Sequence, residues 1–226
     1  MTEVISIPQW DSRLAGTSLS DALRLHTAAA HGVAERTGIV REILRGRVSR
    51  FGYASFMRNL LPAYQALEAG LRTHAAQAGV RLIARPELYR SDAIAADLTV
   101  LAGADRAETL ALLPSGIAYG AQVHRAACTD PALLIGHAYT RCMGDLSGAQ
   151  FLVRSLARAP RLEPAALSFY RFDAIFDHGA FKAGYRRALD AAGCEVADPA
   201  AILCEAALAF ACNIAVSVAV LEANPG

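Results

Sequence analysis

Two glycines, Gly144 and Gly148, lie one helical turn apart with a carboxylate, Asp145, between them in the sequence TRCMGDLSGAQ at residues 140–150. Each glycine inside a helix costs roughly 1 kcal/mol relative to alanine, and a buried carboxylate needs a partner. The two missing side chains leave a groove in which a planar group can approach the backbone. A carboxylate beside that groove can organise water for proton delivery, as general acid–base chemistry requires. This segment is therefore our first candidate for a functional site.

The same segment also has a purely structural interpretation. The glycines can serve close packing between helices, and Arg141 lies one turn before Asp145, where the two can form an ion pair. His137 lies on the same stripe as the glycines and is a rival metal ligand. The residue pattern by itself leaves these interpretations open.

A second candidate is His31, in the sequence LRLHTAAAHGVAE at residues 23–35. His31 and Glu35 share one face of a helix, and the alanines around His31 leave room for a large flat group. A neutral imidazole can bind a metal while Glu35 accepts a hydrogen bond from its other ring nitrogen. The alternative is that His31 pairs with Glu35 and binds nothing.

A third candidate is a group of cations. Lys182 and Arg186, in FKAGYRR at residues 181–187, are four residues apart and project together. Like charges at this spacing are mildly unfavourable unless an anion lies between them. Together with Arg24, which lies about two turns from His31, they could hold carboxylates. The alternative is a solvated basic surface.

The elements that must position these residues are helices. Apolar residues recur with helical spacing and no stretch alternates as a strand does, so the sequence predicts an all-α, single-domain fold. We expect residues 18–223 to form the domain and residues 1–17 a flexible extension. The predicted helices cover residues 18–37, 39–45, 49–77, 91–101, 104–112, 116–128, 130–159, 164–176, 178–192 and the stretch that begins at 198.

Composition limits the classes of protein. The 226 residues include 54% hydrophobic and 19% charged residues with a net charge of +1, which gives no case for a nucleic-acid partner. The five cysteines form no Cys-x-x-Cys pair, and no secretory signal precedes them, so we expect free thiols and a cytoplasmic location. The apolar stretch at residues 200–221 is interrupted by polar residues, which favours a buried helix over a membrane span.

Taken together, the three motifs resemble the haem oxygenase family. HAYTRCMGDLSGAQ at residues 137–150 is similar to the distal helix of that family, TAAAHGVAE at 27–35 to its proximal helix, and FKAGYRR to its propionate-binding stretch. Weaker similarity covers YQALE at 64–68, PELYRSDAIAADL at 86–98 and AFACN at 209–213. The motifs occur in family order over nearly the whole chain.

The resemblance implies haem between a proximal helix and a kinked distal helix, and a role for each candidate residue. His137 matches a family position that is not the iron ligand. The resemblance also implies that His31 is the proximal ligand of the haem iron, with Glu35 as its hydrogen-bonding neighbour, and that Gly144 and Gly148 let the backbone approach the haem. Asp145 would anchor a distal water network that Tyr139 and Arg141 support. The haem propionates would be held by Arg24, Lys182 and Arg186, and the macrocycle edge would contact Phe210.

The sequence departs from the family pattern at several places. Ala149, beside the expected haem face, stands where the family usually has a third glycine, and Ala28 replaces a basic residue common in some members. The chain ends in LEANPG without the hydrophobic tail of membrane-anchored members, so we expect no membrane anchor. No Cys-Pro dipeptide of the kind linked to haem regulation is present.

The resemblance implies oxidative cleavage of haem b to biliverdin, carbon monoxide and ferrous iron. Haem is both cofactor and substrate, with dioxygen and an external reductant supplied through a ferredoxin or a reductase. The product would serve iron acquisition or a system that uses bilins. The main alternative is a non-enzymatic haem carrier or sensor on the same fold. A thiamin-degrading enzyme of related fold would need a cysteine nucleophile with a base, and a ferritin-like di-iron protein would need a Glu-x-x-His motif; neither is found.

Overall fold

The computed structural model describes residues 16–103, 110–157 and 162–224. Helices make up its regular structure, and these residues contain no strand, which confirms the predicted all-α class. The α-helices are α1 (Leu19–Arg36), α2 (Gly38–Leu44), α3 (Arg50–Thr73), α4 (Val80–Ile83), α5 (Ser91–Ala102), α7 (Pro114–Thr129), α8 (Leu134–Ala138), α9 (Gly144–Leu156), α10 (His178–Glu195) and α11 (Pro199–Ala223). Most of the predicted extension, residues 1–17, lies outside the described residues.

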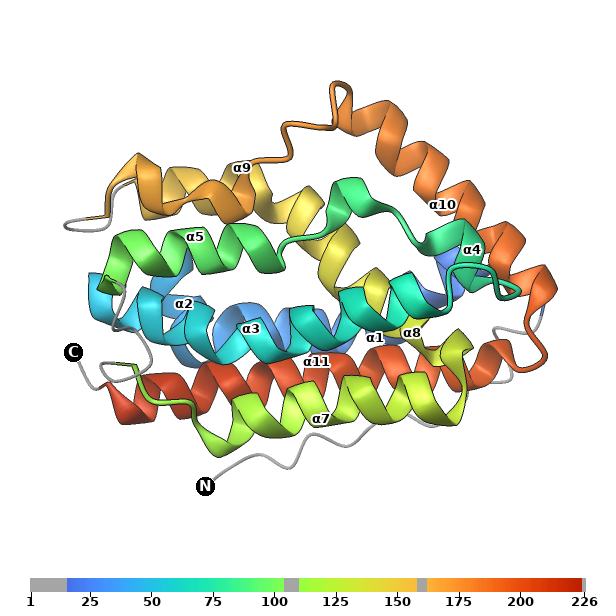
Figure 1. Ribbon diagram of the computed structural model, residues 1–226, viewed down its shortest axis with the longest axis horizontal. Coiled ribbons are helices and arrows are strands. Elements are labelled where there is room, and N and C mark those ends of the chain that lie inside the picture. The colour runs from blue at the N-terminus through green and yellow to red at the C-terminus, as the bar shows by residue number, and fades with distance from the viewer. Residues whose placement is uncertain (1–15, 104–109, 158–161, 225–226) are drawn as a thin grey trace.

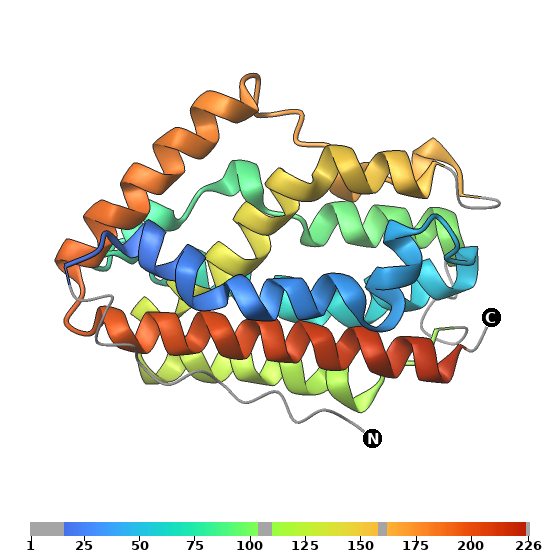
Figure 2. The same ribbon diagram turned by 180° about the vertical axis from the view of Figure 1, so that it is seen from behind.

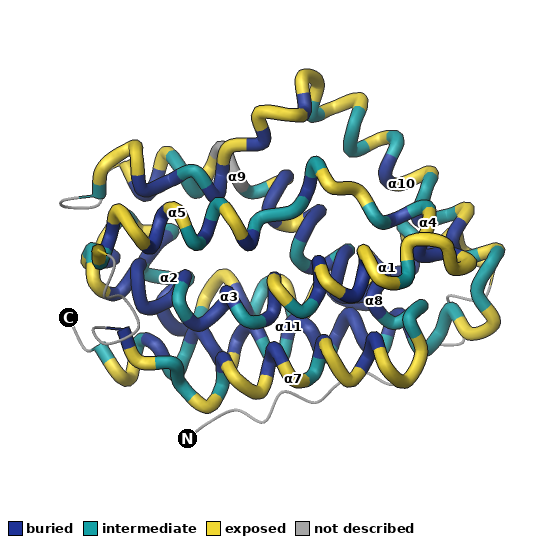
Figure 3. Tube along the Cα trace, viewed as in Figure 1, coloured by how far each residue is buried: buried dark blue, intermediate teal, exposed yellow. Residues whose placement is uncertain are grey.

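The longest helices run side by side along the molecule. Helix α3 packs between α7 and α5, and α11 contacts α1, α2, α3, α7 and α8 (Figures 1 and 2). The largest sets of buried residues belong to α3 and α11, whose inward sides appear dark in Figure 3. Helix α11 is long and apolar enough to cross a membrane, but 61% of its most apolar window is buried inside the fold. Helix α11 is therefore a buried helix, as the sequence predicts.

Polar side chains begin several of these helices where the sequence predicts. Ser18 accepts a hydrogen bond from the backbone N–H of Asp21 at the start of α1, and Asp198 accepts one from Ala201 at the start of α11. Such caps satisfy backbone donors that have no partner within the helix. Asp177 does the same for α10 through the N–H of Ala180.

The predicted single helix over residues 130–159 is interrupted. A short 3₁₀ turn, η3 (Pro131–Leu133), precedes α8, and a π-helical segment, η4 (Tyr139–Met143), separates α8 from α9. A π turn inserts one extra residue into the helix and so rotates the side chains that follow relative to those before it. The helical stripe that we expected to contain both His137 and Gly144 is therefore broken between them.

The predicted helix over residues 164–176 is wrong. Two short 3₁₀ turns, η5 (Pro164–Ala166) and η6 (Ser168–Tyr170), stand there instead. The buried carboxylate of Asp97 on α5 accepts hydrogen bonds from the backbone N–H groups of Ser168 and Phe169, at 2.8 and 2.9 Å. A side chain distant in the sequence thus accepts hydrogen bonds from backbone N–H groups that would otherwise bond within a helix. The helix expected at 104–112 lies mostly outside the described residues, and residues 110–113 are not helical.

Helices α8 and α11 approach each other at Gly136. A Cβ atom at this position would lie 2.7 Å from the carbonyl oxygen of Ile202 and 2.8 Å from the backbone nitrogen of Ala206. Both neighbours are backbone atoms, which cannot move aside as a flexible side chain can. Only glycine therefore permits this contact. The contact fixes the position of α8, from which η4 and α9 continue.

We expect Gly136→Ala to lower the free energy of unfolding by about 1–3 kcal/mol, because the added methyl group forces two backbones apart. Gly184→Ala on α10 is the matched control, since its nearest neighbour would be 3.8 Å away. That substitution should raise stability by up to about 1 kcal/mol through helix propensity. Urea unfolding of the haem-free protein measures both, and equal stabilities of the two variants would contradict the proposed contact.

Candidate functional site

A cavity opens between α1, η4, α9 and α11. It encloses about 890 Å³, including its opening to solvent, and we call it the inner chamber. Most of its wall is apolar, with side chains from α2 and α3. Its lining includes His31, Arg141, Gly144, Asp145, Gly148 and Phe210. The cavity therefore brings the first two candidate motifs of the sequence together.

A second cavity adjoins the first and is more polar. It encloses about 1310 Å³ including its opening, and we call it the outer chamber. His31, Thr140, Gly144 and Phe210 line both chambers. The outer chamber also contains the cations Arg24 and Arg186 and the side chains of Tyr139 and Ser147. Asp21 also lines the outer chamber, and its Oδ1 atom lies 3.3 Å from Nη2 of Arg24. The two chambers form adjoining parts of one site, and the outer part holds two arginines and one carboxylate.

Gly144 and Gly148 form an open wall of the inner chamber. A Cβ atom at Gly144 would meet no atom within 4 Å, and one at Gly148 would meet only the Leu152 side chain at 3.5 Å. This is the opposite of Gly136, where a methyl group would collide with backbone. The interpretation of Gly144 and Gly148 as helix-packing glycines is therefore wrong, and the space above them is available to a ligand.

His31 faces these glycines from α1. Its Nδ1 atom lies 3.7 Å from Oε1 of Glu35, and its ring makes an edge contact with Phe210 at a centroid distance of 5.8 Å. The side chain remains 56% exposed, so a ligand can reach it. Because Glu35 lies beside Nδ1, the other ring nitrogen, Nε2, is left for coordination.

Asp145 is buried and held by side chains from two other elements. The hydroxyl of Tyr64 on α3 donates a hydrogen bond to its Oδ2 atom, and Nη2 of Arg141 lies 3.9 Å from Oδ1. Burial raises the pKa of the Asp145 carboxyl, while the charge of Arg141, the Tyr64 hydrogen bond and the charge of Arg90 act against that rise. A carboxyl with a raised pKa can hold a proton closer to neutral pH than an exposed one can.

Arg141 links this carboxyl to α11. Its Nη1 atom donates to Oδ1 of Asn213 at 2.8 Å, and its guanidinium lies 5.7 Å from the ring centre of Tyr64. The sequence-based reasoning missed Tyr64 and Asn213 as site residues. Each nevertheless lies in a segment of weaker family similarity, YQALE at 64–68 and AFACN at 209–213, which was the available signal.

His137 lines neither chamber. Its ring is fully buried, and Nε2 lies 2.7 Å from Oε1 of Glu205, which also accepts a hydrogen bond from Gln122 at 2.9 Å. These bonds and the charges of His137 and Arg125 outweigh the effect of burial and lower the pKa of Glu205. The interpretation of His137 as a metal ligand is therefore wrong. No cluster of three or more His, Cys, Asp or Glu side chains suited to a metal occurs within the described parts of the chain.

The remaining candidates divide between the chambers and the rest of the fold. Tyr139 lies in the outer chamber, where burial raises the pKa of its hydroxyl and a hydrogen bond with Thr27 and the charges of Arg24 and Arg186 oppose that rise. Tyr139 therefore lies with Arg24 and Arg186 and not beside Asp145. Lys182 is half-buried on α10 and lines neither chamber. The Ala149 side chain lies outside the described ones.

Comparison with known proteins agrees with this geometry. The sequence model of the family described as haem oxygenase matches residues 17–219. The chain belongs to the haem oxygenase family. Haem oxygenase 1 of a Nostoc species is 36% identical over 199 residues, which cover 88% of this chain and 84% of that protein. Human haem oxygenase 1 is 32% identical, over 92% of this chain and 72% of that protein.

Solved structures of haem oxygenases share the fold. The crystal structure of haem oxygenase-1 from Synechocystis in complex with haem has a TM-score of 0.85 and 33% identity, over 92% of this chain and 94% of that one. The haem oxygenase from Leptospira interrogans also has a TM-score of 0.85, with 30% identity over 90% and 100% of the two chains. The family and fold predicted from the sequence are thus confirmed, and none of these findings favours a non-enzymatic haem carrier.

Proposed function

We infer that this protein is a haem oxygenase that binds haem b between α1 and α9. It cleaves the haem, with dioxygen and electrons from an external donor, to biliverdin, carbon monoxide and ferrous iron. One observation carries the proposal: His31 faces two glycines with open space above them, and a buried carboxyl, Asp145, lines the same chamber. A ligand-binding histidine, room for a flat ring and a proton carrier are the three parts that the reaction needs.

The residues present fit a haem. Its apolar faces match the apolar wall of the inner chamber, and its two carboxylates match Arg24 and Arg186 of the outer chamber. We propose that Tyr139 assists these cations, and that it does not support the water network of Asp145. Lys182 would join them only by moving into the outer chamber. We retain the proposal that residues 18–223 form one domain.

The bound haem supplies both the iron that activates dioxygen and the ring that is cleaved. His31 would be the ligand of the iron, with Glu35 holding its Nδ1 atom. As a neutral imidazole, His31 would donate less electron density to the iron than a thiolate ligand does. Phe210 packs against the His31 ring and limits its orientation.

Asp145 would deliver the proton that the proposed reaction needs. Tyr64 and Arg141 fix its carboxyl, and Asn213 in turn fixes Arg141. Because the pKa of the carboxyl is raised by burial, it can take a proton from water and return it to water on the glycine side of the chamber. Because Gly144 and Gly148 have no side chains, their backbone could approach the bound ring directly.

The cellular setting is proposed from the composition and from the reaction. Five free cysteines and the composition favour a cytoplasmic location. We propose that a ferredoxin or a reductase supplies electrons, and that the product serves iron acquisition or a bilin-using system.

The decisive experiment is an absorbance time course of the protein with one equivalent of haemin, in air with ascorbate. We expect a Soret band of bound haem that decays while biliverdin absorbance grows. A Soret band that persists with ascorbate and with a ferredoxin system would contradict cleavage and favour the carrier. No shift of the free-haemin Soret band would contradict haem binding altogether.

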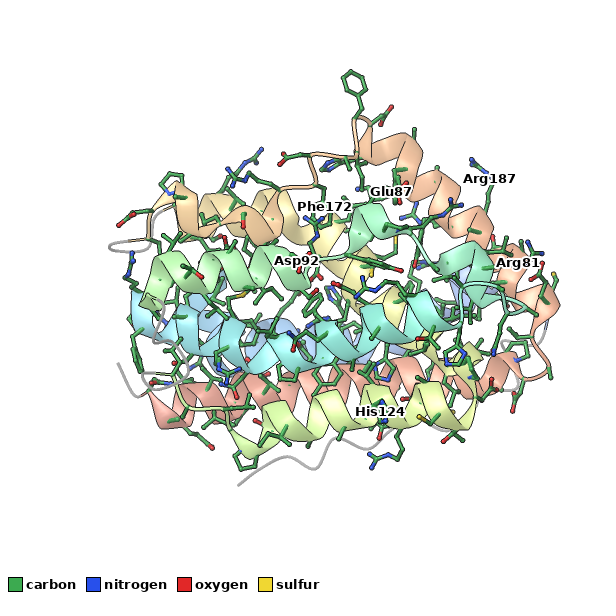
Figure 4. All side chains as sticks on the ribbon, in the orientation of Figure 1. Arg81, Glu87, Asp92, His124, Phe172 and Arg187 are labelled. Carbon is green, nitrogen blue, oxygen red and sulfur yellow. The ribbon has the colours of Figure 1, made fainter. Side chains whose placement is uncertain are left out.

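His31→Ala should remove the histidine-ligated haem spectrum, because the chamber retains no second histidine to replace it. His124→Ala is the control, since His124 is exposed on α7 (Figure 4) and lines neither chamber. The ferric and ferrous–CO spectra of both variants are compared with those of the unmodified protein. An unchanged spectrum in His31→Ala would reject His31 as the ligand.

Asp145→Asn should preserve haem binding and slow biliverdin formation by about 100-fold, because the amide keeps the shape but does not carry the proton. Asp92→Asn, at an exposed carboxylate near the start of α5 (Figure 4), is the control and should react at the normal rate. Single-turnover absorbance measurements separate binding from cleavage. Equal rates in the two variants would remove Asp145 from the proposed mechanism.

A further inference from the structure

The inner chamber has a second polar group, which the proposed function does not use. Tyr170, the last residue of η6, lines the chamber together with Asp145 and is only 7% exposed. Asp97 holds the backbone of Ser168 and Phe169 through hydrogen bonds and so fixes the turn that carries Tyr170. The hydrogen bonds of the buried Asp97 carboxylate thus hold Tyr170 at the wall of the chamber.

Tyr53, in the first turns of α3, lies behind Tyr170 and is completely buried. Its hydroxyl interacts with that of Tyr170, yet it makes no hydrogen bond of normal geometry with any described residue. A buried hydroxyl whose one contact falls short of normal hydrogen-bond geometry is poorly satisfied, and ordered water is the usual way in which proteins satisfy such a group. The pair of tyrosines therefore needs a further polar partner on the side of the chamber.

Ile43, Phe56, Met57 and Leu60 line the same chamber with apolar surface. A buried water needs two to four polar partners, so we expect water in this chamber to lie beside the polar groups of its lining, which include Tyr170 and Asp145. Tyr170 and Asp145 are also close enough to interact electrostatically, an effect second only to burial at Tyr170.

We propose that Tyr170, supported by Tyr53, holds ordered water in the inner chamber and keeps that water connected to Asp145. Tyr170 is then a positioning residue of the proton supply, an inference that rests on the proposed function of Asp145. Burial raises the pKa of both tyrosines, so each stays protonated and acts only through its hydrogen bonds. In the step itself an O–H bond of the water breaks as an O–H bond forms at the Asp145 carboxylate. Solvent replaces the proton, and nothing is oxidised or reduced.

Charged and titratable groups approach Asp145 from each neighbouring element. Arg141 is one turn earlier, Tyr64 approaches from α3, Arg90 precedes α5, and Tyr170 comes from η6. Tyr119 on α7 is also within electrostatic range of Asp145, is fully buried and has an unpartnered hydroxyl, but it lines neither chamber. Tyr119 is therefore a matched control for Tyr170.

The test is an infrared titration of the haem-free protein, in which the Asp145 carboxyl band is assigned by its loss in Asp145→Asn. In Tyr170→Phe the midpoint of this band should rise by about half a pH unit or more, because the carboxylate loses the water that solvates it. Tyr53→Phe should give a smaller rise, and Tyr119→Phe should leave the midpoint unchanged. Equal midpoints in Tyr170→Phe and the unmodified protein, or equal shifts in Tyr170→Phe and Tyr119→Phe, would overturn the proposal.

The kinetic counterpart uses the haem-loaded protein. Tyr170→Phe should lower kcat about fivefold, the value of one hydrogen bond, with an unchanged KM for haem and a larger solvent deuterium isotope effect. Tyr119→Phe should change none of the three, and the same kinetics in both variants would contradict a positioning role. If the unmodified protein fails to cleave haem, the proposed function fails, whereas the infrared midpoint still decides whether Tyr170 holds water beside Asp145.

Discussion

The close contact between α8 and α11 sets the geometry on which the site depends. Gly136 lets the two backbones meet, and the following residues attach to α11 in turn: His137 to Glu205, Thr140 to the carbonyl of Ala206, and Arg141 to Asn213. The π segment lies among these attachments and redirects the chain. Arg141 and Asp145 thereby face the chamber while His137 stays in the core.

Helix α11 also supports the opposite wall. It packs along α1, and its Phe210 meets the ring of His31 at the edge of the cleft. One continuous helix thus contacts α1, which carries the histidine, and also α8 and η4, which lead into the glycine wall. This arrangement explains why a very apolar helix carries a few polar residues: Glu205 and Asn213 are buried, and each holds a side chain of the distal segment.

Local patterns in the sequence predicted most helices and their starts, because helical spacing and caps such as Ser18 and Asp198 act over a few residues. They also identified His31, Gly144 and Asp145. What they missed depends on contacts between distant segments. Asp97 turned an expected helix into η6, and Tyr64 and Asn213 reach Asp145 and Arg141 from other helices. The π segment was equally hidden, since no residue type marks it, and it breaks the stripe on which His137 was expected beside Gly144 as a rival metal ligand.

The weakness of the distal wall has a consequence for turnover. The wall after the π turn contains two glycines with open space above them, so it has less side-chain packing there, and we expect it to open at a lower free energy than the helices around it. The proposed substrate is a flat ring, whereas the proposed product is an open chain that no longer lies in one plane. Because α8 is anchored to α11 by backbone contact, the wall can yield locally while the fold stays closed. The same glycines that make room for the proposed substrate would thus let the distal wall move when a differently shaped product leaves.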